Sequence, residues 1–442
     1  MPALPRALAP LRRPGYRWLA AALVLSLTSS GTYLLAVVWQ VIELGGGPGA
    51  LSLATTGTAV GMLLTTLLGG VLADRVPQRP ILLGVAVTEL VVTSAVAALS
   101  LSGALALAHL AVASLLIGLA QGLYFPAYSA LVPALVPADE LLAANGLEGF
   151  LRPLLLQAAG PAAAGAIVAA SSPGVALLAT AVAALGAVLA LLGLPATPLG
   201  RDRTDEAGQP AAPAGSVLRD VRAGFAYMAA TPWLLSTLLF ASVLVLLIVG
   251  PLEVLTPFAV QEQAGGGPEE HSLVLASFGI AGAVASLVVA SRRLPRRYLT
   301  AMIMLWGTGS LPLAVFGVAD QLWLMVVAAA VVGATFQGAT VIWGTLLQRR
   351  VPPTMLGRVS SLDFFVSLAF LPVSMALAGP VSELIGLAAT FLLAGALPPV
   401  LAVVTIAAAR LRADELAHPL DLPPPVAVDD PDRSPALDLD RR

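Results

Sequence analysis

Long runs of apolar residues separated by short polar stretches dominate the chain. A helix that crosses the hydrocarbon core of a bilayer needs about 20 apolar residues. We expect twelve such helices, at residues 18–42, 51–72, 81–101, 105–125, 147–170, 175–194, 233–255, 273–290, 299–318, 322–346, 364–381 and 385–409. The first run follows a cluster of arginines, as in a signal peptide, but it is too long for one and no polar region follows it. The pattern therefore predicts a membrane protein with several spans.

The composition supports this class. Hydrophobic residues make up 58% and charged residues 11% of the 442 positions, whereas soluble domains are about 25% charged. The mean hydropathy is +0.91. Because the chain has no cysteine and only three histidines, we expect neither a metal site nor a disulfide. The net charge of −2 argues against a nucleic-acid partner.

Arginines occupy alternate loops. The loops after the even-numbered spans carry them, beginning with Arg75 and Arg79, whereas odd loops such as 45–50 and 261–272 carry none. By the positive-inside rule, we expect both termini in the cytoplasm and the chain in the plasma (inner) membrane. The predicted organisation is a cytoplasmic segment (1–17), two six-helix bundles (18–194 and 233–410) joined by a cytoplasmic linker (195–232), and a disordered acidic tail (411–442).

The two bundles repeat each other in sequence. VPADELLAANGLEGF (136–150) aligns with VPPTMLGRVSSLDFF (351–365), which places Glu148 opposite Asp363. DRVPQR (74–79) aligns with RRLPRR (292–297) at nearly the same offset. Parallel repeats related by an axis along the membrane normal are a transporter architecture. The predicted fold class is therefore all-α and integral to the membrane, with twelve helices in two pseudo-symmetric bundles.

One loop resembles a signature of the major facilitator superfamily. In GGVLADRVPQR (69–79), Gly70, Asp74, Arg75 and Arg79 match that signature, whereas Pro77 stands where glycine is usual. The resemblance implies the twelve-helix fold of these transporters over nearly the whole chain. It also implies that Asp74 lies near the start of span eleven, where a helix N-terminus favours a carboxylate.

Other stretches resemble the branch that contains macrolide efflux proteins and the enterobactin exporter. They are FPAYSALVPALVPADELLAANGL (125–147) and LLQRRVPPTMLGRVSSL (346–362). AGPAAAG (159–165) resembles the Gly-Pro motif of antiporters, with Gly160, Pro161 and Gly165 matching, and small residues let helices approach closely. GLAQG departs from the Arg-x-x-Gln-Gly pattern of proton-coupled exporters, because Gly118 replaces the arginine.

Charged residues near the hydrocarbon region cost about 3 kcal/mol or more, so they suggest function. We expect contacts at the cytoplasmic ends of the two bundles to close that face and to break when the bundles rock. Arg75 and Arg79 would reach Asp363. Glu148 would face the arginines at 292–297 or pair with Arg152 one turn away. The alternative is that these charges only fix topology and cap helices. The predicted gating residues are Gly70, Asp74, Arg75, Arg79, Glu148, Arg152, Arg292, Arg293, Arg358 and Asp363.

Three carboxylates are candidates for proton coupling. Glu253 lies between Pro251 and Pro257, which bend the helix, so it either faces a cavity or sits at the outer interface. Glu43 ends span one and is interfacial or coupling. Glu89 lies within span three, where it either couples or hydrogen-bonds to a neighbouring helix.

Spans one, four, seven and ten line the cavity in the family that the chain resembles. Their polar and aromatic residues serve either substrate binding or helix packing: Thr32, Tyr33, Gln40, Gln121, Tyr124, Tyr128, Gln337 and Trp343. An apolar cavity with a few polar groups suits amphiphilic solutes.

We therefore predict a secondary exporter of amphiphilic compounds that works by alternating access with proton antiport. The chain has no P-loop for ATP. The expected partners are a small-molecule substrate, the lipid bilayer and the proton, for a monomer with no cofactor. The alternatives are a dedicated exporter of one metabolite or siderophore, a transport-inactive sensor or scaffold, and a membrane enzyme. The lack of clustered His, Cys or Ser/His/Asp residues argues against the enzyme.

Overall fold

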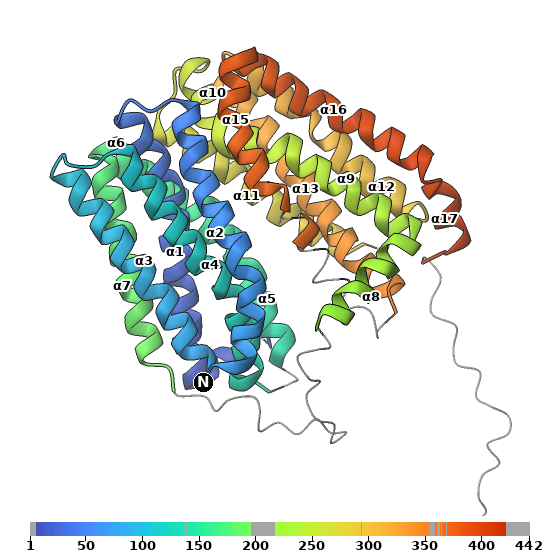
Figure 1. The fold of residues 1–442 in the computed structure, drawn as a ribbon, viewed down its shortest axis with the longest axis horizontal. Coiled ribbons are helices and arrows are strands. Elements are labelled where there is room, and N and C mark those ends of the chain that lie inside the picture. The colour runs from blue at the N-terminus through green and yellow to red at the C-terminus, as the bar shows by residue number, and fades with distance from the viewer. Residues whose placement is uncertain are drawn as a thin grey trace, which may run out of the picture.

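The computed structural model describes residues 6–137, 140–195, 217–292, 294–352, 359, 363, 365–367 and 369–420, with the side chains of 6–8, 67–75, 125, 130, 142, 145, 146, 217–221, 223 and 348 excepted. These residues form two bundles of helices (Figure 1). The first bundle contains α1 (Pro14–Glu43), α2 (Pro48–Arg75), α3 (Gln78–Leu101), α4 (Leu107–Leu135), α5 (Leu141–Pro153), η3 (Leu154–Ala159), α6 (Gly160–Ala170) and α7 (Pro173–Leu192). The second contains α9 (Pro232–Gly250), η6 (Pro251–Leu255), α10 (Thr256–Glu262), α11 (Pro268–Ala290), α12 (Tyr298–Gly309), η7 (Leu311–Gly317), α13 (Leu322–Arg350), α15 (Leu371–Ile385) and α16 (Leu387–Ala408).

Eleven helical segments among the described residues are long and apolar enough to cross a membrane. They are Pro14–Glu43, Gln78–Leu101, Leu107–Ser129, Leu147–Ala170, Pro173–Leu192, Pro232–Glu262, Pro268–Ala290, Tyr298–Gly317, Leu322–Leu347, Phe365–Ile385 and Leu387–Ala408. The twelfth expected span, 51–72, falls within α2, a helix of 28 residues that runs into the excepted side chains. The total of twelve stays a prediction.

Two spans contain a π-helical segment next to a proline. η3 follows Pro153 and precedes the Gly160–Pro161 pair, and η6 begins at Pro251 and precedes Pro257. A proline removes one backbone hydrogen bond and its ring clashes with the preceding turn. Single-turn π-helices often mark functional sites. These two segments lie where the bundles face each other, because both border the same cavities.

Equivalent spans pair in the same way in both bundles. α2 packs along α4 as α11 packs along α13, and α1 packs along α7 as α9 packs along α16. Between the bundles, α15 packs on α2 and α11 packs on η3 and α6. This repeated pairing agrees with the internal repeat that the sequence predicts.

The linker and the tail contain helices that the sequence analysis did not predict. Within the predicted linker, Val217–Ala230 forms α8. Within the predicted disordered tail, Leu411–Ala417 forms α17, so that prediction is wrong for these residues. Leu411 and Glu415 are fully buried. The buried side chain of Leu411 and the carboxylate of Glu415, which has hydrogen-bond partners in α12, hold this segment against the second bundle, although the sequence around it is polar.

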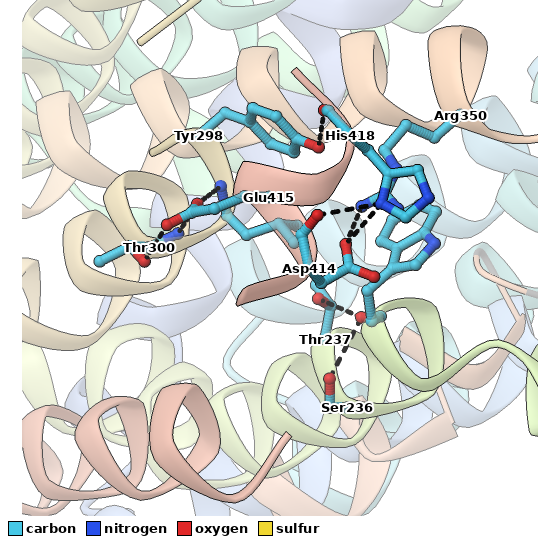
Figure 2. Close-up of polar contacts among 10 residues, drawn as sticks. Ser236, Thr237, Tyr298, Thr300, Arg350, Asp414, Glu415 and His418 are labelled. Carbon is cyan, nitrogen blue, oxygen red and sulfur yellow. Dashed lines mark hydrogen bonds and ion pairs between the residues drawn. The ribbon is translucent and has the colours of Figure 1, made fainter. Parts of the chain in front are cut away.

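α17 packs on three helices at one end of the second bundle (Figure 2). Glu415 accepts hydrogen bonds from the backbone N–H of Leu299 at 2.9 Å and of Thr300 at 3.1 Å. Asp414 forms an ion pair with Arg350, whose guanidinium stacks on the Trp233 ring at 4.5 Å. The helix therefore joins α12 and α16 to the end of α13, where Arg350 also contacts Trp233 at the start of α9.

Candidate functional site

A cavity of about 210 Å³ lies between the two bundles. α1, α2, α4 and η3 contribute its wall from the first bundle, and η6, α11 and α15 contribute its wall from the second. Most of the lining is apolar. Its polar side chains are Ser30, Tyr33, Thr55, Thr58, Gln121, Glu253 and His271.

Glu253 lies in the π-helical segment η6 and borders two cavities. It lines the cavity of about 210 Å³ and a neighbouring one of about 140 Å³, which share Leu34, Leu156 and Leu275 as well. Among the described residues it has no hydrogen-bond partner. A carboxylate with no protein partner in an apolar wall favours a proton or a cationic group as its ligand.

His271 is another polar group in the lining of this cavity, and the sequence analysis did not single it out. It is 2% exposed and lines the same cavity, and its Nδ1 has no hydrogen-bond partner among the described residues. Its ring lies 6.4 Å from the ring of Trp39 in α1, whose Nε1 also lacks a described partner. The sequence signal was a lone histidine in the first turn of an apolar span, which the analysis weighed only as a metal ligand.

Gln121 connects the cavity to Glu89. Its Nε2 donates to Ser30 Oγ at 3.1 Å and approaches Glu89 Oε1 at 3.4 Å. Glu89 is 6% exposed and does not line the cavity of about 210 Å³. Tyr33, another polar residue in the cavity lining, bonds with Ser114 Oγ at 3.1 Å. Glu89 thus has a hydrogen bond with a neighbouring helix, in which it accepts from Gln121 of α4.

Two of the predicted cavity residues and Glu43 lie elsewhere in the first bundle. Gln40 is 2% exposed, accepts a hydrogen bond from Ser100 and donates to Glu43 Oε2 at 3.1 Å. Glu43 is exposed at the end of α1, in agreement with an interfacial position. Thr32 is buried in α1 and does not line the cavity of about 210 Å³. Gln40 therefore connects α1 to α3.

The other predicted cavity residues also pack within a bundle. Tyr124 and Tyr128 stack with ring centroids 5.8 Å apart. Gln337 of α13 packs against Gly282 of α11. Trp343 donates from Nε1 to Asp363 at 3.0 Å. These four do not line the cavities of about 210 and 140 Å³.

The two ends of the molecule differ in how closely the bundles approach. We call the end with Arg79, Arg292 and Arg350 the arginine-rich end and the opposite one the far end. Toward the arginine-rich end, a third cavity of about 460 Å³ separates α5 from α11. The bundles meet near α6, α10 and the start of α2, and they spread apart toward α5 and α8 (Figure 1).

Four of the charged residues predicted to gate have described partners within their own bundles. Arg79 donates to the carbonyls of Leu191 at 3.1 Å and Leu192 at 2.8 Å, at the end of α7. It therefore does not reach Asp363, which accepts from Trp343 and from Ser367 in its own bundle.

The same holds for Glu148. It forms an ion pair of 2.6 Å with Arg152, so the structure contains the local pairing rather than a contact with the 292–297 cluster. Arg292 is exposed. The Arg293 and Arg358 positions lie outside the described residues, and so do the side chains of the α2 residues Gly70, Asp74 and Arg75.

Gly160, Pro161 and Gly165 lie where helices approach closely. A Cβ atom on Gly160 would lie 2.8 Å from the Cα of Gly31 in α1. Pro161 lines the cavity of about 140 Å³. A Cβ atom on Gly165 would lie 2.8 Å from the carbonyl oxygen of Pro268 in the other bundle.

Known proteins resemble this chain over most of its length. The family model described as "transmembrane secretion effector" matches residues 5–437. Macrolide efflux protein A of Streptococcus pyogenes is 24% identical over 395 residues, which cover 87% of this chain and 93% of that protein. Enterobactin exporter EntS of Shigella boydii is 26% identical over 361 residues, which cover 79% and 80%. The crystal structure of nucleoside transporter NupG has a TM-score of 0.70 at 13% identity, over 88% of this chain and 98% of that one; this likeness shows the shared fold.

Proposed function

Because the chain belongs to the transmembrane secretion effector family of major facilitator transporters, we propose that it exports amphiphilic small molecules by proton-coupled alternating access. Two of the relatives described above are named as an efflux protein and an exporter. The substrate class, the antiport and the proton are our proposal.

One observation carries the proposal: the cavity of about 210 Å³ between the bundles is largely apolar and contains a single carboxylate, Glu253. Apolar walls bind the hydrophobic part of a solute, and a few polar groups fix its orientation. Glu253 also has no described partner, so either a proton or a cationic substrate group can occupy it. If a proton and the cationic group of a substrate bind to Glu253 in turn, their exchange at this carboxylate would couple proton movement to substrate export.

The position of the cavity fits one state of the transport cycle. We propose that the arginine-rich end and both termini face the cytoplasm, as the distribution of arginines suggests. The cavity of about 460 Å³ toward that end and the close contacts at the far end would then correspond to a conformation open toward the cytoplasm. Rocking of the two bundles would expose the same cavity to the other side.

Transport into inside-out vesicles tests the proposal. With an imposed proton gradient, we expect the chain to accumulate ethidium or erythromycin, a macrolide. Glu253→Gln should abolish the gradient dependence, whereas Glu262→Gln, at an exposed glutamate in the same span, should leave it unchanged. No accumulation of either compound above empty vesicles would contradict the export of amphiphiles. Full gradient dependence in Glu253→Gln would contradict the role of this carboxylate.

A dedicated exporter of one siderophore remains a second candidate, because one relative is named an enterobactin exporter. The two candidates differ in selectivity. Accumulation of a catecholate siderophore together with failure to accumulate ethidium and erythromycin would favour the dedicated exporter.

A further inference from the structure

A glutamine that the sequence analysis did not consider lines the smaller cavity beside Glu253. Gln157 belongs to η3 of the first bundle and Glu253 to η6 of the second, and both line the cavity of about 140 Å³. The third polar residue of this lining is Thr256, whose hydroxyl donates to the Leu252 carbonyl at 2.6 Å. The two π-helical segments therefore face each other across this cavity, and each contributes one polar side chain.

The amide group of Gln157 has no hydrogen-bond partner among the described residues. Its Oε1 is buried and unsatisfied. A buried polar group without a partner shifts an equilibrium by about 5- to 150-fold against the state that contains it. The amide turns with broad freedom about its last side-chain bond, so its oxygen can face the cavity. A ligand that enters the cavity and donates a hydrogen bond to this oxygen removes the cost.

Packing against the other bundle holds the start of the Gln157 side chain in place. A Cβ atom on Gly279 of α11 would lie 2.9 Å from the Cβ of Gln157. Real Cβ atoms essentially never come within 3.0 Å of another atom, so this glycine lets α11 lie directly on Gln157. The contact fixes the base of the side chain, and the amide at its end is the part that remains free to turn.

The two unpartnered groups select different properties of a ligand. The Glu253 carboxylate in an apolar wall favours a positive charge. The Gln157 oxygen is neutral, so it selects a hydrogen-bond donor rather than a charge. A primary or secondary ammonium group has at least two N–H groups and can donate to both acceptors. A tertiary ammonium has one N–H group and leaves one acceptor unsatisfied, and a quaternary ammonium leaves both.

We propose that Gln157 and Glu253 together bind the ammonium group of a primary or secondary amine, and that Gln157 determines the preference for this substrate class. The apolar body of the amine extends into the cavity of about 210 Å³, which Glu253 also lines. The inference rests on the binding of cationic substrate groups at Glu253 that forms part of the proposed function. Ligands with fewer N–H groups still bind through the carboxylate, more weakly, so the site does not exclude ethidium or erythromycin.

A series of four ligands that differ in their number of N–H groups tests this preference. The ligands are phenylbutylamine and its derivatives with one, two and three N-methyl groups. All four are cations at neutral pH, because an alkylamine such as the lysine side chain has a pKa of about 10.4. Titration calorimetry with the protein in lipid nanodiscs gives each Kd after subtraction of the heat measured with empty nanodiscs. The measurement needs no proton gradient, so it reports binding separately from transport.

In the unsubstituted protein, the Kd should increase about 5- to 150-fold from the secondary to the tertiary amine, because the tertiary amine leaves one acceptor unsatisfied. Gln157→Met keeps the length of the side chain but lacks the amide, so this step should disappear. The step from the tertiary to the quaternary amine, which reports on Glu253, should remain in this variant. Gln261→Met is the matched control, at an exposed glutamine in the same span as Glu253, and it should retain both steps.

Equal Kd values for the secondary and tertiary amines in the unsubstituted protein would overturn the proposal, and this comparison needs no variant. An equal step in Gln157→Met and in the unsubstituted protein would overturn it as well, because a step caused by the size of the added methyl group does not depend on the amide. A failure of vesicle transport together with the expected ligand series would contradict the proposed export and leave the amine site standing. Vesicle transport together with a flat ligand series would contradict the amine site alone.

Discussion

Replacement of Glu415 by alanine should release α17 from the second bundle. Glu415 is fully buried, and its carboxylate accepts from Leu299 N, Thr300 N and Thr300 Oγ1, the last at 2.7 Å (Figure 2). The two backbone N–H groups lie in the first turn of α12, so the helix itself offers them no acceptor. Alanine leaves both of them unsatisfied as long as α17 remains docked, the Leu299 group fully buried and the Thr300 group partly so.

The magnitude follows from these two donors. A buried donor without a partner costs about 1–3 kcal/mol, so the docked form of Glu415→Ala loses at least about 2 kcal/mol relative to the undocked form, in which water reaches both groups. Each 1.4 kcal/mol corresponds to about a factor of ten in population. We therefore expect the undocked population to increase about 30-fold. Glu415→Gln keeps the shape and the three contacts but loses the charge, so its increase should stay below about tenfold.

Limited proteolysis measures the undocked population. Arg410 and Arg412 are exposed, and trypsin cuts after them only when the segment unfolds locally, at a rate that follows the open population. Cleavage at these two positions should be about 30-fold faster in Glu415→Ala than in the unsubstituted protein. Equal cleavage rates in the two proteins would refute the capping role. Equal rates in Glu415→Ala and Glu415→Gln would show that charge, rather than the lost acceptors, determines docking.

Three further substitutions separate the roles of single residues. Arg79→Ala removes two hydrogen bonds to carbonyls at the end of α7, so thermal unfolding should show a loss of about 1–2 kcal/mol; a transport defect per folded molecule would instead support gating. His271→Phe removes a polar group from the cavity, so the KM for transport should increase about five- to tenfold with no loss of stability, and His271→Gln should increase it less. The Arg13 hydrogen bond lowers the pKa of the Glu140 carboxyl, so the contact should be present at neutral pH and lost as the pH falls through that lowered pKa. The anisotropy of a dye at Ala9→Cys should decrease in acid, and Glu140→Gln should show the low value already at pH 7.

The spans and the internal repeat were predictable because hydropathy and charge act locally along the chain. Apolar runs of about 20 residues specify helices in a bilayer whatever their partners are. Glu253 was predictable for the same reason, since the prolines on both sides of it mark an interrupted helix, and the structure places it in a π-helical segment beside the cavity. The spans and the position of this carboxylate each follow from one continuous stretch of the chain, and the two bundles follow from the repetition of such stretches.

The features that the sequence analysis missed depend on partners far away in the chain. Glu383 bonds to Gly49 over a separation of 334 residues, and Glu415 bonds to Leu299 over 116. No local pattern distinguishes these glutamates from others at helix ends. The place of His271 in the cavity was missed because its neighbour Trp39 belongs to the other bundle and is distant in the sequence. Arg79 was assigned to a contact between the bundles because its actual partners, the carbonyls at the end of α7, lie more than 100 residues away in the chain. For Glu148, the sequence left both a contact between the bundles and the pairing with Arg152 open, and the structure contains the pairing.

These nearer partners bear on how the bundles can move. At the arginine-rich end, Arg79 bonds to α7, Glu148 to Arg152 and Asp363 to Trp343, each within its own bundle. A charge with a local partner remains satisfied when the bundles separate, so opening that end leaves none of these three charges unpaired. The far end differs, because Gly379 of α15 and Gly165 of α6 directly contact backbone and small side chains of the other bundle there, and Glu383 adds one carboxylate. Contacts of this kind are short in range and little affected by salt, whereas charged contacts between the bundles would be screened. The packing that closes the far end should therefore change little with salt.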